Sequence, residues 1–370
     1  MKWIFKSFTN DFLRLYLPGL LALGGLLLIN GHNGLGSEVN SNNGQATWLI
    51  IVFNFLIFSC IDMGHTYTTM IKTYFDRSEH KISHMVWITP VIAIASMIIW
   101  RYFFDFRWFW VSVLYYTLFH HQRQSFGVMK WYESLNKNYY TASKPFFYLL
   151  TWLPFIAYHF RGTMPLFGAY YPDKATLIDV PINPTAIEFM GHNFVFQNIY
   201  HAIIVGLWFA VVNVWLLWEI NNYLTHKKLE WNRLLSIIYY SGSFAYAFLV
   251  STSYLESFTL LVTAHGVAYM FMLNKRVTSL PHQKEKGPKW IKRMPYIIIT
   301  VAVLGAIVDT ITKYMVHGGN MDTATKIFSE PSVGQLILIM LYVVPSLCHY
   351  IWDAYLWKKG HPDWKYFIRD

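Results

Sequence analysis

The sequence predicts an all-α integral membrane protein, a polytopic bundle of about ten transmembrane helices with both termini in the cytoplasm. The 370-residue chain is 55% hydrophobic and only 14% charged, whereas a soluble domain carries about 25% charged residues. Its apolar residues gather in long runs, and a helix needs roughly 20 of them to cross a bilayer. Lys and Arg are spread unevenly between these runs, which is the pattern that orients membrane proteins.

Ten segments are apolar enough to be transmembrane helices, and together they form one predicted membrane domain over residues 1–370. They cover residues 12–30, 47–72, 84–103, 108–131, 145–160, 195–222, 232–251, 255–273, 293–316 and 334–357. No small-x-small cleavage site follows the first segment, so we expect a membrane helix there rather than a cleaved signal peptide.

The connecting segments alternate between rich and poor in Lys and Arg. Residues 31–46 contain none, whereas residues 72–83 contain three. Residues 161–194 contain only two, and residues 274–293 are strongly basic. Basic loops stay in the cytoplasm, so we expect 274–293 to be a cytoplasmic loop and 161–194 to be an extracytoplasmic cap. The net charge of +10 then reflects membrane orientation, and we expect a bacterial-type plasma membrane location and no nucleic-acid partner.

Histidines collect in the cytoplasmic half of the even-numbered segments. Four of these five segments carry one or two there: His65, His120 with His121, His265 and His349. At a rise of about 1.5 Å per residue, three of them lie roughly 10–15 Å from the basic end of their helix. A shared depth on separate helices predicts that His65, His265 and His349 converge on one site.

Two acidic residues lie on the same helix faces as these histidines. Asp62 precedes His65 by three residues, and Asp353 follows His349 by four. A charged residue inside a span costs about 2.5–3.5 kcal/mol even on mild scales, so it normally faces the protein interior. Each aspartate is expected either to bind a metal or to orient its histidine.

The residue types predict a metal site. The expected ligands are His65, His121, His265 and His349, with His120 as a further ligand or a hydrogen-bond partner. Imidazole with carboxylate and no thiolate favours iron, in a mononuclear or dinuclear site, with zinc as the second choice. We expect Cys60 and Cys348 to be packed thiols, since two cysteines do not build a disulfide scaffold.

Other polar residues carry weaker signals. Tyr269 follows His265 by four residues and would either hydrogen-bond a bound oxygen species or pack in the core. Arg123 would hold a carboxylate or an anionic headgroup, or extend to lipid phosphates. These two are the catalytic candidates. A second polar group near the opposite membrane face is expected to be solvated or interfacial; it comprises His159, His192, His201, Glu256, Asp309 and His317.

The arrangement resembles the broad class of histidine-rich membrane iron enzymes, which includes desaturases, alkane hydroxylases and Brp/Blh-type carotene-cleaving oxygenases. The resemblance rests on DMGH at 62–65, HH at 120–121, His265 and HYIWD at 349–353. The histidines of these motifs do not form the HxxxH and HxxHH boxes of desaturases and alkane hydroxylases. The resemblance implies iron, dioxygen and a lipid or isoprenoid substrate, and it assigns no residue roles.

The leading functional prediction is therefore a metal-dependent membrane oxidoreductase acting on an apolar substrate. Its partners would be membrane lipids, an apolar small molecule and an electron donor. A zinc version would be a hydrolase that uses metal-bound water. Two alternatives use the same residues differently: a proton- or metal-coupled transporter, and a lipid transferase with a catalytic histidine and no metal.

Overall fold

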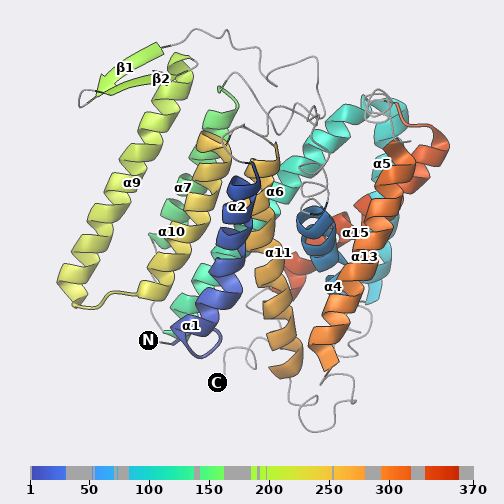
Figure 1. Ribbon diagram of the computed structural model, residues 1–370, viewed down its shortest axis with the longest axis horizontal. Coiled ribbons are helices and arrows are strands. Elements are labelled where there is room, and N and C mark those ends of the chain that lie inside the picture. The colour runs from blue at the N-terminus through green and yellow to red at the C-terminus, as the bar shows by residue number, and fades with distance from the viewer. Residues whose placement is uncertain are drawn as a thin grey trace. The chain divides into compact units, whose positions relative to one another are not determined.

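The computed structural model shows a helical protein (Figure 1). It describes residues 2–30, 52, 55–70, 73, 83–136, 142–161, 185–189, 192–196, 198–251, 254–279, 293–317 and 330–357. Residues 31–46, most of 161–194 and residues 280–292 lie outside this part of the chain, so the predicted loop positions there stay predictions.

Each of the ten predicted segments is helical over most of its described part. The α-helices are α1 (Phe8–Asp11), α2 (Leu17–Asn30), α4 (Gly64–Met70), α5 (Ser83–Phe103), α6 (Phe106–Leu135), α7 (Ser143–Tyr158), α9 (Ile199–His226), α10 (Trp231–Ala245), α11 (Tyr254–Ser279), α13 (Met294–His317) and α15 (Val333–Leu356). Three π-helical stretches are continuous with these helices. They are η1 (Phe12–Tyr16) between α1 and α2, η2 (Phe55–Met63) directly before α4, and η5 (Tyr246–Val250) directly after α10.

Six helical segments are long and apolar enough to cross a membrane, which indicates a membrane protein. Within the described residues they are Phe8–Leu28, His84–Phe103, Ile199–His226, Trp231–Val250, Glu256–Ser279 and Val333–Leu356. The count of ten spans stays a prediction.

A short β-hairpin precedes α9 and corrects the predicted start of a helix at residue 195. Strand β1 (Thr185–Phe189) pairs antiparallel with β2 (His192–Phe196), with Thr185 opposite Phe196 and Phe189 opposite His192. The aromatic and β-branched residues of β2 suit a strand. The Asn198 side chain then accepts a hydrogen bond from the His201 amide at 2.9 Å. This cap explains why α9 begins only at Ile199.

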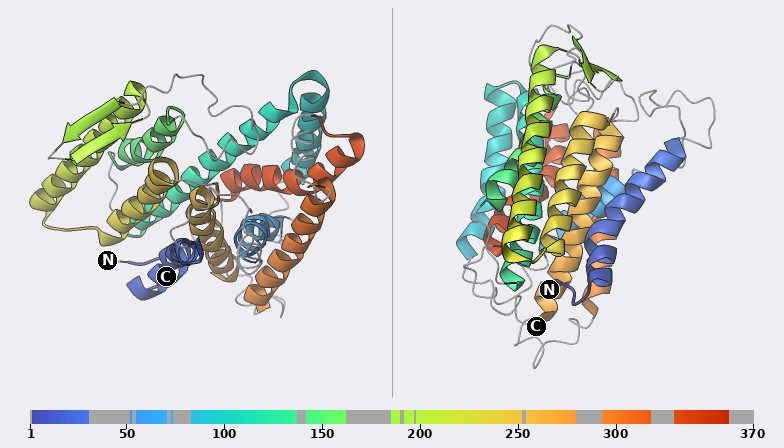
Figure 2. Two further views of the ribbon diagram at one scale, coloured as in Figure 1. Left: turned by 45° about the horizontal axis from the view of Figure 1, so that its top comes forward. Right: turned by 90° about the vertical axis from the view of Figure 1, so that its left-hand side faces the viewer.

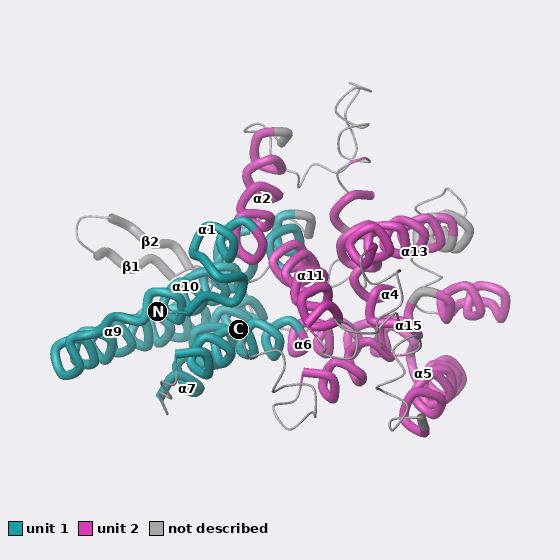
Figure 3. Tube along the Cα trace, turned by 90° about the horizontal axis from the view of Figure 1, so that it is seen from below, with its two compact units in different colours: residues 1–13, 30–38, 121–261 teal, residues 14–29, 39–120, 262–370 magenta. Residues whose placement is uncertain are grey.

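The chain forms two compact units (Figure 3). Unit 1 comprises Met1–Leu13, Asn30–Glu38 and His121–Leu261, and unit 2 comprises Arg14–Ile29, Val39–His120 and Val262–Asp370. The helices α6 and α11 contribute residues to both units, and the boundary within α6 falls between the adjacent histidines His120 and His121.

In unit 1, α7 packs against α9 and α10, and a buried ion pair joins α9 to α10. The guanidinium of Arg233 donates to both carboxylate oxygens of Glu219, at 2.6 and 2.5 Å. The indole of Trp215 donates to the same carboxylate at 3.0 Å. Because both charges are paired in a two-pronged contact, this group is a structural link between neighbouring helices.

In unit 2, η2 and α4 pack against α13, and α15 packs against α4, α5 and α13. The left-hand view of Figure 2 shows α4 among α11, α13 and α15. Gly64 and Gly266 mark the closest approaches. A Cβ atom on Gly64 would lie 2.7 Å from the Cβ of Ala302, and one on Gly266 would lie 3.0 Å from the Ile61 carbonyl oxygen. Small residues at these positions let the helix backbones come together.

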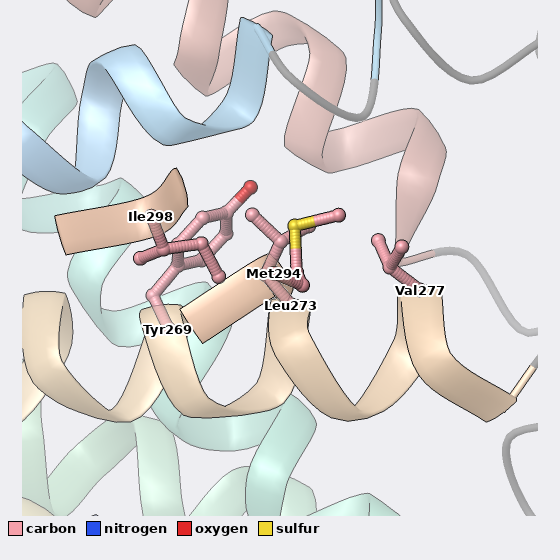
Figure 4. Close-up of a cluster of buried hydrophobic side chains, with 5 residues drawn as sticks. All are labelled: Tyr269, Leu273, Val277, Met294 and Ile298. Atoms are coloured by element: carbon pink, nitrogen blue, oxygen red, sulfur yellow. The ribbon is translucent and has the colours of Figure 1, made fainter. Parts of the chain in front are cut away.

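A hydrophobic cluster joins α11 to α13 within unit 2 (Figure 4). Its buried members are Tyr269, Leu273, Val277, Met294 and Ile298. The spacing of four residues along each helix places these side chains on one face. The ring of Tyr269 belongs to this apolar cluster, and its hydroxyl extends beyond it (Figure 4).

Candidate metal centre

Four buried histidines from four helices of unit 2 lie together. His65 comes from α4, His120 from α6, His265 from α11 and His349 from α15, and their exposed fractions are 1%, 7%, 2% and 0%. The Nε2 atoms of His65 and His265 are 3.0 Å apart. The Nε2 atoms of His120 and His349 are 3.1 Å apart. We refer to these four residues as the histidine cluster.

The four imidazole rings form a closed ring of neighbours. The centroid of His65 is 4.7 Å from those of His265 and His349. The centroid of His120 is 4.8 Å from that of His265 and 4.7 Å from that of His349. Across the ring, the centroids of His265 and His349 are 6.2 Å apart. The side chains of four helices therefore surround one point in the interior of unit 2.

These positions fit metal binding. Ligands of one ion lie about 2.0–2.2 Å from it, so their donor atoms lie roughly 3–4 Å apart. Two groups offer ligand atoms that lie within 4.8 Å of one another: His65 with His265 and His349, and His120 with His349 and Asp353. Both groups share His349.

The ring of His65 is held by a main-chain oxygen. Its Nδ1 atom lies 3.0 Å from the carbonyl oxygen of Ile61, one turn earlier. A carbonyl only accepts, so Nδ1 carries the proton and Nε2 presents its lone pair toward His265. The carboxylate of Asp62 is 3.8 Å from the same nitrogen, and its side chain is 30% exposed. Asp62 thus lies farther from Nδ1 of His65 than the Ile61 carbonyl does, and its predicted role as a ligand or orienting group stays a prediction.

The ring of His349 is held by side chains. Its Nδ1 atom lies 2.6 Å from the hydroxyl oxygen of Thr69. That oxygen is 2.7 Å from the hydroxyl of Tyr269, which donates to Oδ1 of Asp353 at 2.9 Å. Asp353 also lies beside the cluster, since its Oδ2 atom is 3.7 Å from Nε2 of His120. Thr69, Tyr269 and Asp353 are all buried.

The structure thus brings together most of the predicted site residues: His65, His120, His265, His349, Asp353 and Tyr269. Of the adjacent pair in α6, His120 lies in the cluster, whereas His121 belongs to unit 1. Arg123 is also in unit 1, where it is exposed and donates to the Tyr148 hydroxyl at 3.3 Å. Successive helix residues point about 100° apart, which is why only one histidine of the pair faces this centre.

Two contributors were not predicted as site residues. Thr69 is recognisable in sequence only as part of a polar stripe four residues after His65. The carbonyl of Ile61 has no sequence signal, because every residue carries one. Arg276 also differs from expectation: α11 continues to Ser279, so this arginine lies in a helix, not in a loop, and it is buried at 3% exposure. Its guanidinium donates to the Leu356 carbonyl.

The second polar group is more buried than expected. His159, His201 and Glu256 are 8%, 8% and 7% exposed, which corrects their predicted solvated roles. Nδ1 of His159 donates to the Phe155 carbonyl at 2.8 Å, a contact within α7 and its cap. The side chains of His192, Asp309 and His317 lie outside the described part of the chain.

The cysteine nearest the histidine cluster in sequence packs among apolar side chains. Cys348 is 1% exposed and shares a cluster with Val86, Trp352 and Leu356. Neither metal group identified among the described residues contains a cysteine. The donors are therefore imidazole and carboxylate.

Comparisons of the chain with family models, curated proteins and solved structures find no match. The resemblance to histidine-rich membrane iron enzymes therefore stays a prediction, and the function has to be inferred from the histidine cluster.

Proposed function

We propose that this protein is a metal-dependent integral membrane oxidoreductase, with iron as its metal and a lipid or isoprenoid as its substrate. The observation that carries the proposal is the convergence of four buried imidazoles from four helices. Neutral imidazole is the commonest metal ligand in proteins. Burying several polar rings is costly unless each is hydrogen-bonded or bound, and a shared metal ion would satisfy all four at once.

The donor set favours iron. The centre offers imidazole nitrogens and the nearby carboxylate of Asp353, a combination that suits iron or zinc rather than copper(I). An iron site would supply redox chemistry, for which an electron donor and dioxygen are the expected co-reactants. With zinc at the same residues, the protein would instead be a hydrolase. The number of ions bound is part of the same proposal and is either one or two.

The membrane arrangement supports an apolar substrate. We propose ten spans with both termini and residues 274–293 in the cytoplasm of a bacterial-type plasma membrane. The alternation of basic and non-basic loops supports this orientation. The histidine cluster would then lie in the cytoplasmic half of the bundle, and an apolar substrate would reach it from the bilayer.

Metal content after substitution tests the proposal. The wild-type protein, purified in detergent, should carry stoichiometric metal by mass spectrometry. His265→Ala and His349→Ala should each remove most of it, because each deletes a ligand, while the protein remains in the membrane. His84→Ala is the matched control, since His84 is exposed on α5 of the same unit, and should retain the metal. A wild-type protein without metal, after growth in iron- and zinc-replete medium, would contradict the proposal.

One observation favours a second candidate, a proton-coupled transporter. The His65–His265 contact at 3.0 Å is also the length of an N–H···N hydrogen bond, and the chain from His349 to Asp353 is continuous. Proton relays in transporters use such groups. A metal-free protein whose His349→Ala variant loses proton-driven uptake in proteoliposomes would establish this candidate instead. A metal-free protein with acyl or prenyl transfer activity would point to the lipid transferase.

A further inference from the structure

We infer that Thr69 and Tyr269 are positioning residues that hold the proton of His349 on Nδ1, so that its Nε2 atom presents a lone pair to the histidine cluster. In this arrangement Asp353 is the final acceptor of a hydrogen-bonded chain. The consequence for metal affinity rests on the proposed function, whereas the position of the proton does not.

The number of available protons determines the direction of the chain. Tyr269 has one hydroxyl proton and donates it to Oδ1 of Asp353 at 2.9 Å. The oxygen of Tyr269 therefore only accepts in its 2.7 Å contact with the Thr69 hydroxyl, and the His65 carbonyl, 3.4 Å from the same hydroxyl, also only accepts. Both contacts call on the one proton of Thr69. With that proton committed, the oxygen of Thr69 accepts at its 2.6 Å contact with His349. The donor in this last contact is Nδ1–H of His349.

The opposite tautomer would place a proton where the cluster needs a lone pair. Nε2 of His349 faces Nε2 of His120 at 3.1 Å. A proton on Nε2 of His349 would fill the space between the rings and exclude a cation from it. His65 reaches the same tautomer by a different route, through the Ile61 carbonyl at 3.0 Å. Two neighbouring rings of the histidine cluster, those of His65 and His349, thus carry their proton on Nδ1.

The hydrogen-bonded chain also gives the two carboxylate oxygens of Asp353 different partners. Oδ1 accepts from Tyr269, and the same oxygen lies 3.7 Å from Nδ1 of His349. Its contact with Tyr269 holds Oδ1 beside Nδ1 of His349, while Oδ2 lies 3.7 Å from Nε2 of His120. Removing the hydroxyl of either Thr69 or Tyr269 should therefore alter the position of the proton on His349 more than it alters any other ligand.

The test compares the histidine tautomer in four variants of the full-length protein. Thr69→Val removes the hydroxyl and keeps the shape, and Thr69→Ser restores a hydroxyl. Tyr269→Phe breaks the next contact. Thr68→Val is the matched control, because Thr68 is equally buried in α4 but bonds only the His65 carbonyl, at 2.6 Å. Solid-state 15N NMR of metal-free, 15N-histidine-labelled protein in lipid reports which nitrogen of His349 is protonated. The signal is assigned by its loss in His349→Gln.

We expect a protonated Nδ1 in the wild type, Thr69→Ser and Thr68→Val, and a shift of the proton toward Nε2 in Thr69→Val and Tyr269→Phe. A wild-type His349 with its proton on Nε2 would overturn the inference, as would equal tautomers in Thr69→Val and Thr68→Val. If Thr69→Val does not fold, Tyr269→Phe against Thr69→Ser makes the same comparison.

Binding of Co²⁺, followed by its visible spectrum, gives the second measurement. Loss of an orienting partner typically weakens metal binding about 10–100-fold, and we expect this for Thr69→Val but not for Thr68→Val. The double variant Thr69→Val/Tyr269→Phe should bind little more weakly than Thr69→Val alone, because both changes break one chain. A wild type that binds no Co²⁺ would count against the proposed function and leave the NMR result to decide the inference.

Discussion

The ring of His65 depends on a main-chain oxygen, and this distinguishes the two aspartates. Asp62 is 3.8 Å from Nδ1 of His65 and partly exposed, whereas Asp353 is buried and accepts a hydrogen bond from Tyr269. Two aspartates that both share a helix face with a histidine therefore have different surroundings. The Ile61 carbonyl, at 3.0 Å, does for His65 what a carboxylate often does for a metal ligand.

We accordingly expect Asp62→Asn to change Co²⁺ affinity by less than about twofold, well below the 10–100-fold cost of losing a true orienting partner. Equilibrium titration of the purified protein measures it. Asp353→Leu in parallel should weaken binding strongly, because it removes the acceptor of the Tyr269 hydroxyl. A large loss of Co²⁺ affinity in Asp62→Asn would instead show that the Asp62 carboxylate takes part in the metal site.

At the scale of elements, the cluster depends on how closely α4 approaches α13. Gly64 follows the π-helical stretch η2 and directly precedes His65. A Cβ atom there would lie 2.7 Å from the Cβ and 3.0 Å from the Cα of Ala302 on α13. The helix that carries His65 therefore has no room for a larger side chain at this position unless α4 and α13 move apart.

Gly64→Ala should therefore destabilise the protein by about 1–3 kcal/mol, the usual cost of overpacking. Gly242→Ala provides the control, since nothing lies within 4 Å of a Cβ at that helical position. There, alanine should be neutral or stabilise by up to about 1 kcal/mol, because it favours helix more than glycine. Thermal denaturation in one detergent measures both, and a Gly64→Ala protein as stable as the Gly242→Ala protein would refute the packing argument.

At the scale of the whole molecule, orientation in the membrane is the testable property. The Lys and Arg pattern predicts that residues 274–293 lie in the cytoplasm and residues 161–194 outside. Residues 274–293 begin within α11, which ends at Ser279. A label at Ser279 therefore reports on the end of the helix that carries His265.

We expect Asp173→Cys, and not Ser279→Cys, to react with a membrane-impermeant thiol reagent in intact cells, in a background without Cys60 and Cys348. Both positions should react once the cells are opened, which controls for accessibility. Labelling of Ser279→Cys in intact cells would reverse the orientation and place the histidine cluster toward the outside.

The sequence by itself determined the helical membrane class and which histidines share a depth, because both follow from apolar run length and the fixed rise of a helix. It also identified Asp353 and Tyr269 through their four-residue spacing from His349 and His265. Sequence spacing relates residues only along one helix. The choice of His120 over His121, the contact of Thr69 with His349 and the carbonyl of Ile61 depend on how each helix is rotated against its neighbours. That rotation is set by packing, such as Gly64 against Ala302, and so only the tertiary structure decided it.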